Sequence, residues 1–245
     1  MSKIWSWIRK MRGKYSSISY PILKDQDGDR LVSDEAEVAE MFANHYEKVS
    51  SSESYSPQFQ ASRLRSERMH IDFSVNNYMS YNEDFSMCEL ERALSSCRDT
   101  SPGLDSISYR MIKYSHPTCK SFLLILFNKI WNTCYFPEKW RTGIVLSFLK
   151  PGKDPSDVKS YRPISLTSCV SKLLEKMVNT RLVLVLESKG LLPQQQNGFR
   201  KMRSTQNSLE KVTSNILSAL NQKSIALCVS FDIEKAYEKT WRYHI

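Results

Sequence analysis

Asp232 is the residue of this chain whose position best suits metal chemistry. It directly follows residues 225–231, a short and almost wholly apolar run. Such a run predicts a buried strand, and the side chain at its end would emerge at the rim of a sheet. A carboxylate held there could bind Mg²⁺, which prefers hard oxygen ligands. Taken without further motifs, a strand-terminal aspartate that caps a turn is the favoured interpretation.

Lys150 and Arg162 are of residue types that suit contact with phosphate. An arginine suits bidentate contact with a phosphate, and a lysine supplies a mobile point charge. Pro163 restricts Arg162 to extended geometry, which fits the arm of a hairpin. Lys153 has the same reach as Lys150, so the choice between these two lysines stays open.

The positive charge of the chain is concentrated in one window. Residues 139–203 hold 13 Lys and Arg against 4 Asp and Glu, whereas residues 33–99 hold 6 against 13. A local excess of this size favours a polyanionic partner, most simply nucleic acid. A basic face that is merely solvated is the alternative.

Helical periodicity and capping signals predict the elements that position these residues. Helices are predicted from Ser33 onward, after the capping box Ser86-x-x-Glu89, and over residues 122–134, 168–188 and 204–220. Residues 143–149 are predicted to form a strand. Turns are predicted at Pro151-Gly152 and Asp27-Gly28-Asp29, and a loose linker over residues 50–66.

Composition excludes two classes of protein. Hydrophobic residues make up 41% of the 245, but no run is long enough to span a membrane. The apolar stretch at the start of the sequence is too short and too aromatic for a secretory signal. The six cysteines have neither zinc nor paired spacing and are interpreted as free thiols. We therefore expect an intracellular protein of the nucleus or cytoplasm, not a secreted one.

Four ordered motifs resemble one family, the reverse transcriptases of jockey-type non-LTR retrotransposons. The motifs are Ser101-Pro102-Gly103-Leu104-Asp105, Lys150-Pro151-Gly152-Lys153-Asp154 with Ser160-Tyr161-Arg162-Pro163, Gln196-Asn197-Gly198-Phe199-Arg200, and Phe231-Asp232-Ile233-Glu234-Lys235-Ala236-Tyr237. Each is short, but their order and spacing make coincidence improbable.

The resemblance implies an α+β fold of the right-hand polymerase type. Residues 1–100 would be a helix-rich linker or N-terminal extension that precedes the polymerase. Residues 101–245 would be a partial reverse transcriptase domain, with the fingers and the first strand of the palm. The sequence would then stop just after the first palm motif.

The resemblance also implies residue roles. Asp232 would be the catalytic carboxylate that contacts two Mg²⁺ ions, and the Ile233 carbonyl would be a further ligand. Tyr237 would be a gate against ribose, or else an ordinary core tyrosine. Nucleotide contacts would come from Lys150, Arg162, Lys235 and Ala236, and template contacts from Gln196, Phe199, Arg200 and Arg203. For Phe199, plain packing is an equal alternative.

The implied function is RNA-directed DNA synthesis, with dNTPs, a DNA primer and an RNA template as partners and no membrane. Ser230 and Glu238 depart from the family pattern, which usually has a bulky apolar residue and an aspartate there. The further palm carboxylates are absent from these 245 residues, so we expect the fragment alone to be inactive and residues 225–231 to lie exposed. The alternatives are a non-catalytic nucleic-acid-binding remnant and a product without any role. The sequence predicts no oligomeric state.

Overall fold

The computed structural model describes residues 21–25, 30–70, 79–233, 235–236 and 240–241. These residues form two compact units. The first takes its described residues from Met1–Ile71, Val145–Ser165 and Lys235–Ile245, and the second from Asp72–Ile144 and Leu166–Glu234. The predicted turn at residues 27–29 lies outside the described residues. The domain boundary between residues 100 and 101 stays a prediction.

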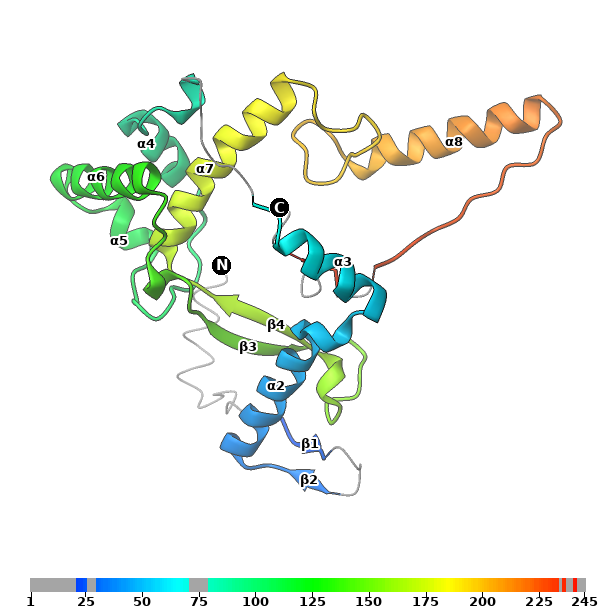
Figure 1. The fold of residues 1–245 in the computed structure, drawn as a ribbon, viewed down its shortest axis with the longest axis horizontal. Coiled ribbons are helices and arrows are strands. Elements are labelled where there is room, and N and C mark those ends of the chain that lie inside the picture. Colours follow the sequence, from blue (N-terminus) through cyan, green and yellow to red (C-terminus); the bar gives the residue numbers. More distant parts are fainter. Residues whose placement is uncertain (1–20, 26–29, 71–78, 234, 237–239, 242–245) are drawn as a thin grey trace, which may run out of the picture. The chain divides into compact units, whose positions relative to one another are not determined.

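The first unit begins with a small antiparallel sheet and a helix (Figure 1). Strands β1 (Leu23–Lys24) and β2 (Leu31–Val32) pair with Leu23 opposite Val32. Helix α2 (Glu35–Ser50) follows, and Asp34 caps it by accepting from the backbone N–H groups of Ala36 and Glu37. The cap is thus one residue later than the predicted Ser33, because the longer acceptor Asp34 reaches both N–H groups.

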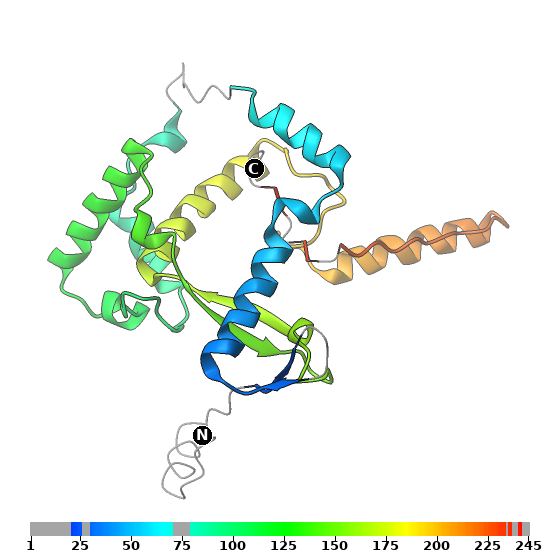
Figure 2. The same cartoon turned by 60° about the horizontal axis from the view of Figure 1, so that its bottom comes forward.

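Strands β3 (Ile144–Leu149) and β4 (Tyr161–Leu166) form the predicted hairpin. A turn and the 3₁₀ helix η4 (Val158–Ser160) connect them. Helix α2 crosses this hairpin (Figure 2) and packs beside η4. The Tyr46 hydroxyl donates to Ser147 Oγ at 2.8 Å, and the Phe42 and Tyr161 rings meet edge-on at 5.0 Å. The hairpin therefore shares one small core with α2.

The prediction of a loose linker over residues 50–66 is wrong. Helix α3 (Pro57–Glu67) occupies most of it, preceded by the 3₁₀ helix η1 (Ser52–Ser54). Ser56 Oγ accepts from Phe59 N–H at 3.3 Å, and Pro57 takes the first helical position. This local capping starts a helix despite a polar composition that predicted none.

The second unit is a helical cluster. Its helices are α4 (Met87–Ser95), α5 (Tyr109–Lys113), α6 (Pro117–Thr133), α7 (Cys169–Ser188) and α8 (Thr205–Asn221), with the 3₁₀ helices η2 (Ser80–Asn82) and η3 (Glu138–Trp140). The structure confirms the Ser86–Glu89 capping box and the helices predicted over residues 122–134, 168–188 and 204–220. All six cysteines are free; Cys97 and Cys169 are buried, and Cys88, Cys119, Cys134 and Cys228 are exposed.

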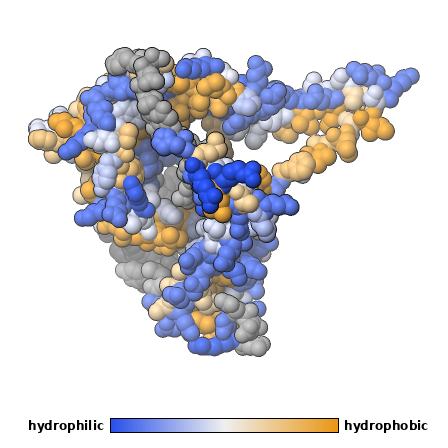
Figure 3. Space-filling view, in the orientation of Figure 1, coloured by the Kyte–Doolittle hydropathy of each residue, from blue (hydrophilic) through white to orange (hydrophobic). Residues whose placement is uncertain are grey.

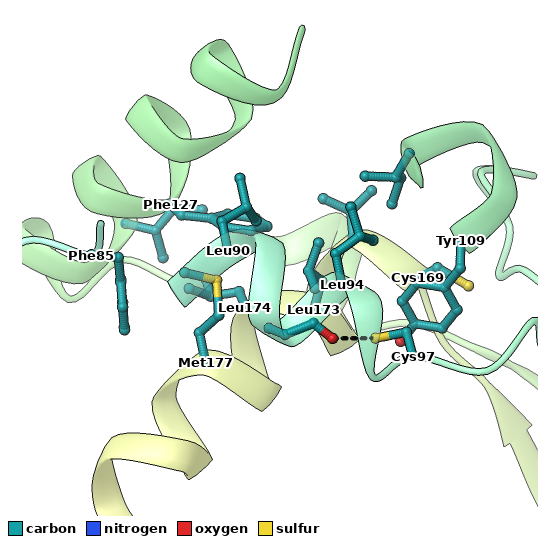
Figure 4. Close-up of a cluster of buried hydrophobic side chains, with 14 residues drawn as sticks. Phe85, Leu90, Leu94, Cys97, Tyr109, Phe127, Cys169, Leu173, Leu174 and Met177 are labelled. Atoms are coloured by element: carbon teal, nitrogen blue, oxygen red, sulfur yellow. Dashed lines mark hydrogen bonds between the residues drawn. The ribbon is translucent and has the colours of Figure 1, made fainter. Parts of the chain in front are cut away.

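The core of this unit lies where α4, α6 and α7 meet (Figure 4). Leu90, Leu94, Phe127 and Leu173 are almost fully buried there. Full burial of such a side chain contributes about 1.5–3 kcal/mol. Gly103 lies against the backbone that enters α7, because a Cβ there would come within 2.7 Å of Ser168 N. The Ser-Pro-Gly motif thus has a packing reason for its glycine.

The strand predicted over residues 225–231 is wrong, although the exposure predicted for this segment is confirmed. The segment has no regular structure, and Phe231 is 89% exposed. Figure 3 shows apolar residues gathered on the arm formed by α8 and the segment that follows it. A strand needs a neighbour to pair its backbone groups, and the described residues offer none to this segment. Within the described chain, no helix combines the length and apolar character needed to cross a membrane.

Candidate functional site

Asp232 and Ile233 are exposed residues of the second unit. The predicted anchoring of Asp232 by a buried strand is wrong, since the preceding segment is neither buried nor paired. Among the described residues, no group of three or more His, Cys, Asp or Glu side chains could hold a metal ion. Asp232 therefore offers one carboxylate ligand, and the described residues do not make a complete Mg²⁺ site.

Lys150 and Arg162 belong to the first unit, at the hairpin. The Lys150 backbone N–H donates to the Ser160 carbonyl at 2.8 Å, and its Nζ donates to the Lys159 carbonyl at 2.9 Å. The Arg162 side chain is exposed, with no hydrogen-bond or ionic partner in the part of the chain that the structure describes. Its guanidinium is thus available to a phosphate, whereas the Lys150 ammonium is partly engaged.

His45 is a residue that the sequence reasoning missed. It lies on α2, and burial lowers its pKa from the usual 6.5. The charges of Lys235, Lys159 and Lys150 lower that pKa further, and only Asp157 opposes them. In the first unit, the charges of three lysines therefore act on a half-buried histidine and disfavour its charged form. The sequence signal is weak: His45 borders the apolar face that carries Phe42 and Tyr46.

The predicted nucleotide contacts at the C-terminal end are described only in part. Lys235 has the left-handed backbone conformation, with a φ of 54°. The Ala236 carbonyl accepts from Thr240 Oγ1 at 2.5 Å. Tyr237 lies outside the described residues, so its role as a gate stays a prediction.

Arg200 is anchored inside the second unit. Its Nε and Nη2 donate to the two carboxylate oxygens of Glu187 at 2.8 and 2.5 Å. Its Nη1 donates to the carbonyls of Pro193 and Gln196 at 2.8 and 3.3 Å. The Arg200 side chain is only 9% exposed. Its guanidinium is thus occupied within the protein, a structural role that the sequence reasoning missed.

Arg203 and Asn197 lie in the same loop as Arg200. Arg203 Nη1 donates to the Gln194 carbonyl at 2.6 Å and to Asn197 Oδ1 at 3.2 Å. Asn197 is buried, and its Nδ2 donates to Ser208 Oγ of α8 at 2.9 Å. Asn197 thereby ties the loop to α8.

Phe199 is 99% exposed in this loop. The alternative interpretation of Phe199 as a packing residue is therefore wrong within the described chain. Gln196 is also exposed, and its backbone N–H donates to the Pro193 carbonyl at 3.1 Å. The four predicted template contacts are thus brought together in one loop, with two side chains exposed and two arginines bonded internally.

Comparison with known proteins gives a consistent family. Residues 149–244 match the model of the family described as "Reverse transcriptase (RNA-dependent DNA polymerase)". The chain is 28% identical over 218 residues, 87% of its length, to the probable RNA-directed DNA polymerase from transposon BS of Drosophila melanogaster. It is 31% identical over 207 residues, 84% of its length, to the RNA-directed DNA polymerase from mobile element jockey of Drosophila funebris.

The chain covers only a part of these relatives. It spans 23% of the transposon BS protein and 22% of the Drosophila funebris jockey protein. A probable RNA-directed DNA polymerase from the X-element of Drosophila melanogaster is 33% identical over 158 residues, which are 64% of this chain and 17% of that protein. These matches confirm the resemblance that the four motifs predicted.

Proposed function

We propose that this chain, whose residues 149–244 match the reverse transcriptase family, supplies the fingers and the start of the palm of an RNA-directed DNA polymerase. The enzyme adds dNTPs to a primer on an RNA template. The family match of residues 149–244 carries the proposal, because it includes strand β4 with Arg162, the loop of residues 193–203 (the Arg200 loop) and Asp232.

The hairpin and its surroundings are proposed to bind the triphosphate. Arg162 is exposed and free for bidentate phosphate contact. Lys150, Lys159 and Lys235 add positive charge within the same unit. Binding the triphosphate here orients the nucleotide for attack and offsets its negative charge.

Asp232 is proposed to be one ligand of the magnesium ions that the family resemblance implies. Such ions, when bound, lower the pKa of an attacking hydroxyl and neutralise charge on the leaving phosphate. Because the described residues contain no group of three or more His, Cys, Asp or Glu side chains that could hold a metal ion, they do not complete this site. The role of this chain is to present Asp232 directly after its apolar segment.

A second candidate function is nucleic-acid binding without synthesis. The exposed Phe199 beside the basic residues of its loop favours it, because aromatic stacking and charge together bind single strands. This function would need no metal and no dNTP.

A chimera tests the two functions against each other. Residues 101–245 replace the matching segment of an active jockey-type polymerase, and cDNA synthesis from an RNA template is measured. We expect dNTP incorporation. A chimera that melts cooperatively and binds RNA but incorporates no dNTP would contradict the polymerase role and favour the second function.

A further inference from the structure

Two large apolar side chains of the Arg200 loop lie wholly in solvent. Phe199 is 99% exposed and Met202 is 100% exposed. Both have the left-handed backbone conformation, with φ values of 59° and 60°. This conformation is unfavourable for any residue other than glycine, and full exposure gains no burial energy. Strain without compensating packing is typical of a functional site.

The loop is held in this conformation from within. Arg200 binds Glu187 through two hydrogen bonds and also donates to two loop carbonyls. Arg203 joins the Gln194 carbonyl to the Asn197 side chain. These contacts fix both ends of the loop, so the exposure of Phe199 and Met202 is built into the fold.

A hollow opens beside Met202. Its volume is about 440 Å³, and its lining includes Asn197, Met202, Arg203, Asn207, Glu210 and Lys211. Arg200 is paired with Glu187 and Arg203 is bonded within the loop, so the remaining charged residues between 187 and 211 are the cations Lys189, Lys201 and Lys211 and the acid Glu210. An apolar surface within a cationic surround matches a single-stranded nucleic acid, whose bases stack while its phosphates are neutralised.

We propose that Phe199 and Met202 contact the unpaired bases of a single-stranded nucleic acid, and that Arg200 and Arg203 are positioning residues that hold the loop and do not bind phosphate. The inference rests on the proposed nucleic-acid function and deepens it. It assigns a contact to Met202 and reverses the role that the sequence predicted for the two arginines.

The first test measures binding of the full chain to a labelled single-stranded RNA by fluorescence anisotropy. Phe199→Ala and Met202→Ala should each weaken binding about fivefold to twentyfold, within the range for loss of a base contact. Tyr114→Ala and Met111→Ala are matched controls, since both side chains are exposed on or next to α5 of the same unit. Neither control should change affinity.

The salt dependence of RNA binding distinguishes contacts to bases from contacts to phosphates. Because Phe199 and Met202 carry no charge, their alanine variants should lower affinity without changing the slope of log K against log[salt]. A flatter slope in either variant would show that phosphate contacts were lost as well, and would overturn the assignment to base contacts.

Glu187→Gln gives opposite signs for the two roles of Arg200. If Arg200 positions the loop, the loss of the Glu187 carboxylate loosens the loop. RNA binding then weakens, and hydrogen exchange over residues 193–203 becomes faster. If Arg200 binds phosphate itself, the substitution removes a competing negative charge and binding tightens. Tighter binding would overturn the positioning role.

The outcomes separate the inference from the function on which it rests. RNA binding by the wild-type chain with unchanged affinity in Phe199→Ala and Met202→Ala overturns the inference alone. Failure of the wild-type chain to bind RNA at low salt overturns both.

Discussion

Ser168 donates its hydroxyl proton to Asp105 Oδ2 at 2.6 Å, across 63 residues of sequence. The same hydroxyl oxygen accepts from Val170 N–H at 3.1 Å and Ser171 N–H at 3.3 Å, and so caps α7. The other carboxylate oxygen of Asp105 accepts from Ile107 N–H at 3.1 Å. The aspartate of the Ser-Pro-Gly-x-Asp motif therefore accepts two hydrogen bonds, one of which fixes the residue that caps α7.

Asp105→Asn should destabilise the chain, because an amide presents one acceptor oxygen and its NH₂ would meet a donor or a saturated hydroxyl. We expect a loss of about 1–3 kcal/mol in the free energy of unfolding. Asp99→Asn removes the same charge from an exposed pair with Arg110 and should cost much less. Equal stability of Asp105→Asn and wild type in urea unfolding would refute the role of the carboxylate.

Arg181→Lys should also destabilise the second unit. All five N–H donors of Arg181 are used: two bind Glu89, and three bind the carbonyls of Tyr81, Glu83 and Asp84. Its guanidinium also lies 4.0 Å from the centre of the Phe85 ring. A lysine can neither fork nor stack in this way, so we expect a loss of about 3 kcal/mol in thermal or urea unfolding.

The Arg181 variant also has a pH signature. Hydrogen bonds from Arg181 are the largest cause that lowers the pKa of Glu89 from 4.5 to about 2. The corresponding stability is therefore present above pH 4.5 and is lost as pH falls towards 2. Arg181→Lys should flatten this acid-induced loss. An unchanged pH profile between 4.5 and 2 would show that Arg181 does not hold the Glu89 charge.

The lowered pKa of His45 predicts that the free energy of unfolding also changes in a higher pH range. Burial, followed by the charges of Lys235 and Lys159, lowers its pKa from 6.5. The folded chain therefore binds this proton less readily than the unfolded chain does. Stability should be greatest above pH 6.5 and fall as pH drops through the lowered pKa. His45→Gln should remove this component, which urea unfolding between pH 7.5 and 5 can measure.

Arg162→Ala, tested in the chimera of residues 101–245, should raise the KM for dNTP with little change in kcat. A charge-assisted hydrogen bond to phosphate contributes about 1.5–3 kcal/mol, and this one is expected in ground and transition states alike. Lys153→Ala is the comparison, since Lys153 is a neighbouring exposed cation and the rival candidate for this contact. A KM that rises only in Lys153→Ala would move the phosphate contact to Lys153.

Local signals in the sequence predicted most helices correctly, because caps and periodicity lie within a few residues. The Ser86–Glu89 box and the Ser168 cap are examples. The strand at residues 225–231 failed because apolar composition indicates burial but cannot supply a pairing partner. Helix α3 was missed because its start depends on Ser56 and Pro57, whereas its composition resembles a linker.

The candidate site was predictable in its residue types but not in its pairings. Motif spacing found the loop of Phe199, Arg200 and Arg203. It could not show that Arg200 binds Glu187, thirteen residues earlier, because that contact depends on how the chain turns after α7. His45 was missed for the same reason: its cationic neighbours come from distant parts of the sequence.

The central claim is that Asp232 belongs to a polymerase active site, and primer extension by the chimera tests it most directly. Asp232→Asn keeps the size of the side chain but removes a carboxylate that metal-assisted phosphoryl transfer needs. Glu138→Gln, an exposed carboxylate on η3, is the matched control. We expect Asp232→Asn to abolish dNTP incorporation on an RNA template while Glu138→Gln keeps it. Incorporation by Asp232→Asn at the wild-type rate would contradict the assignment of the palm motif.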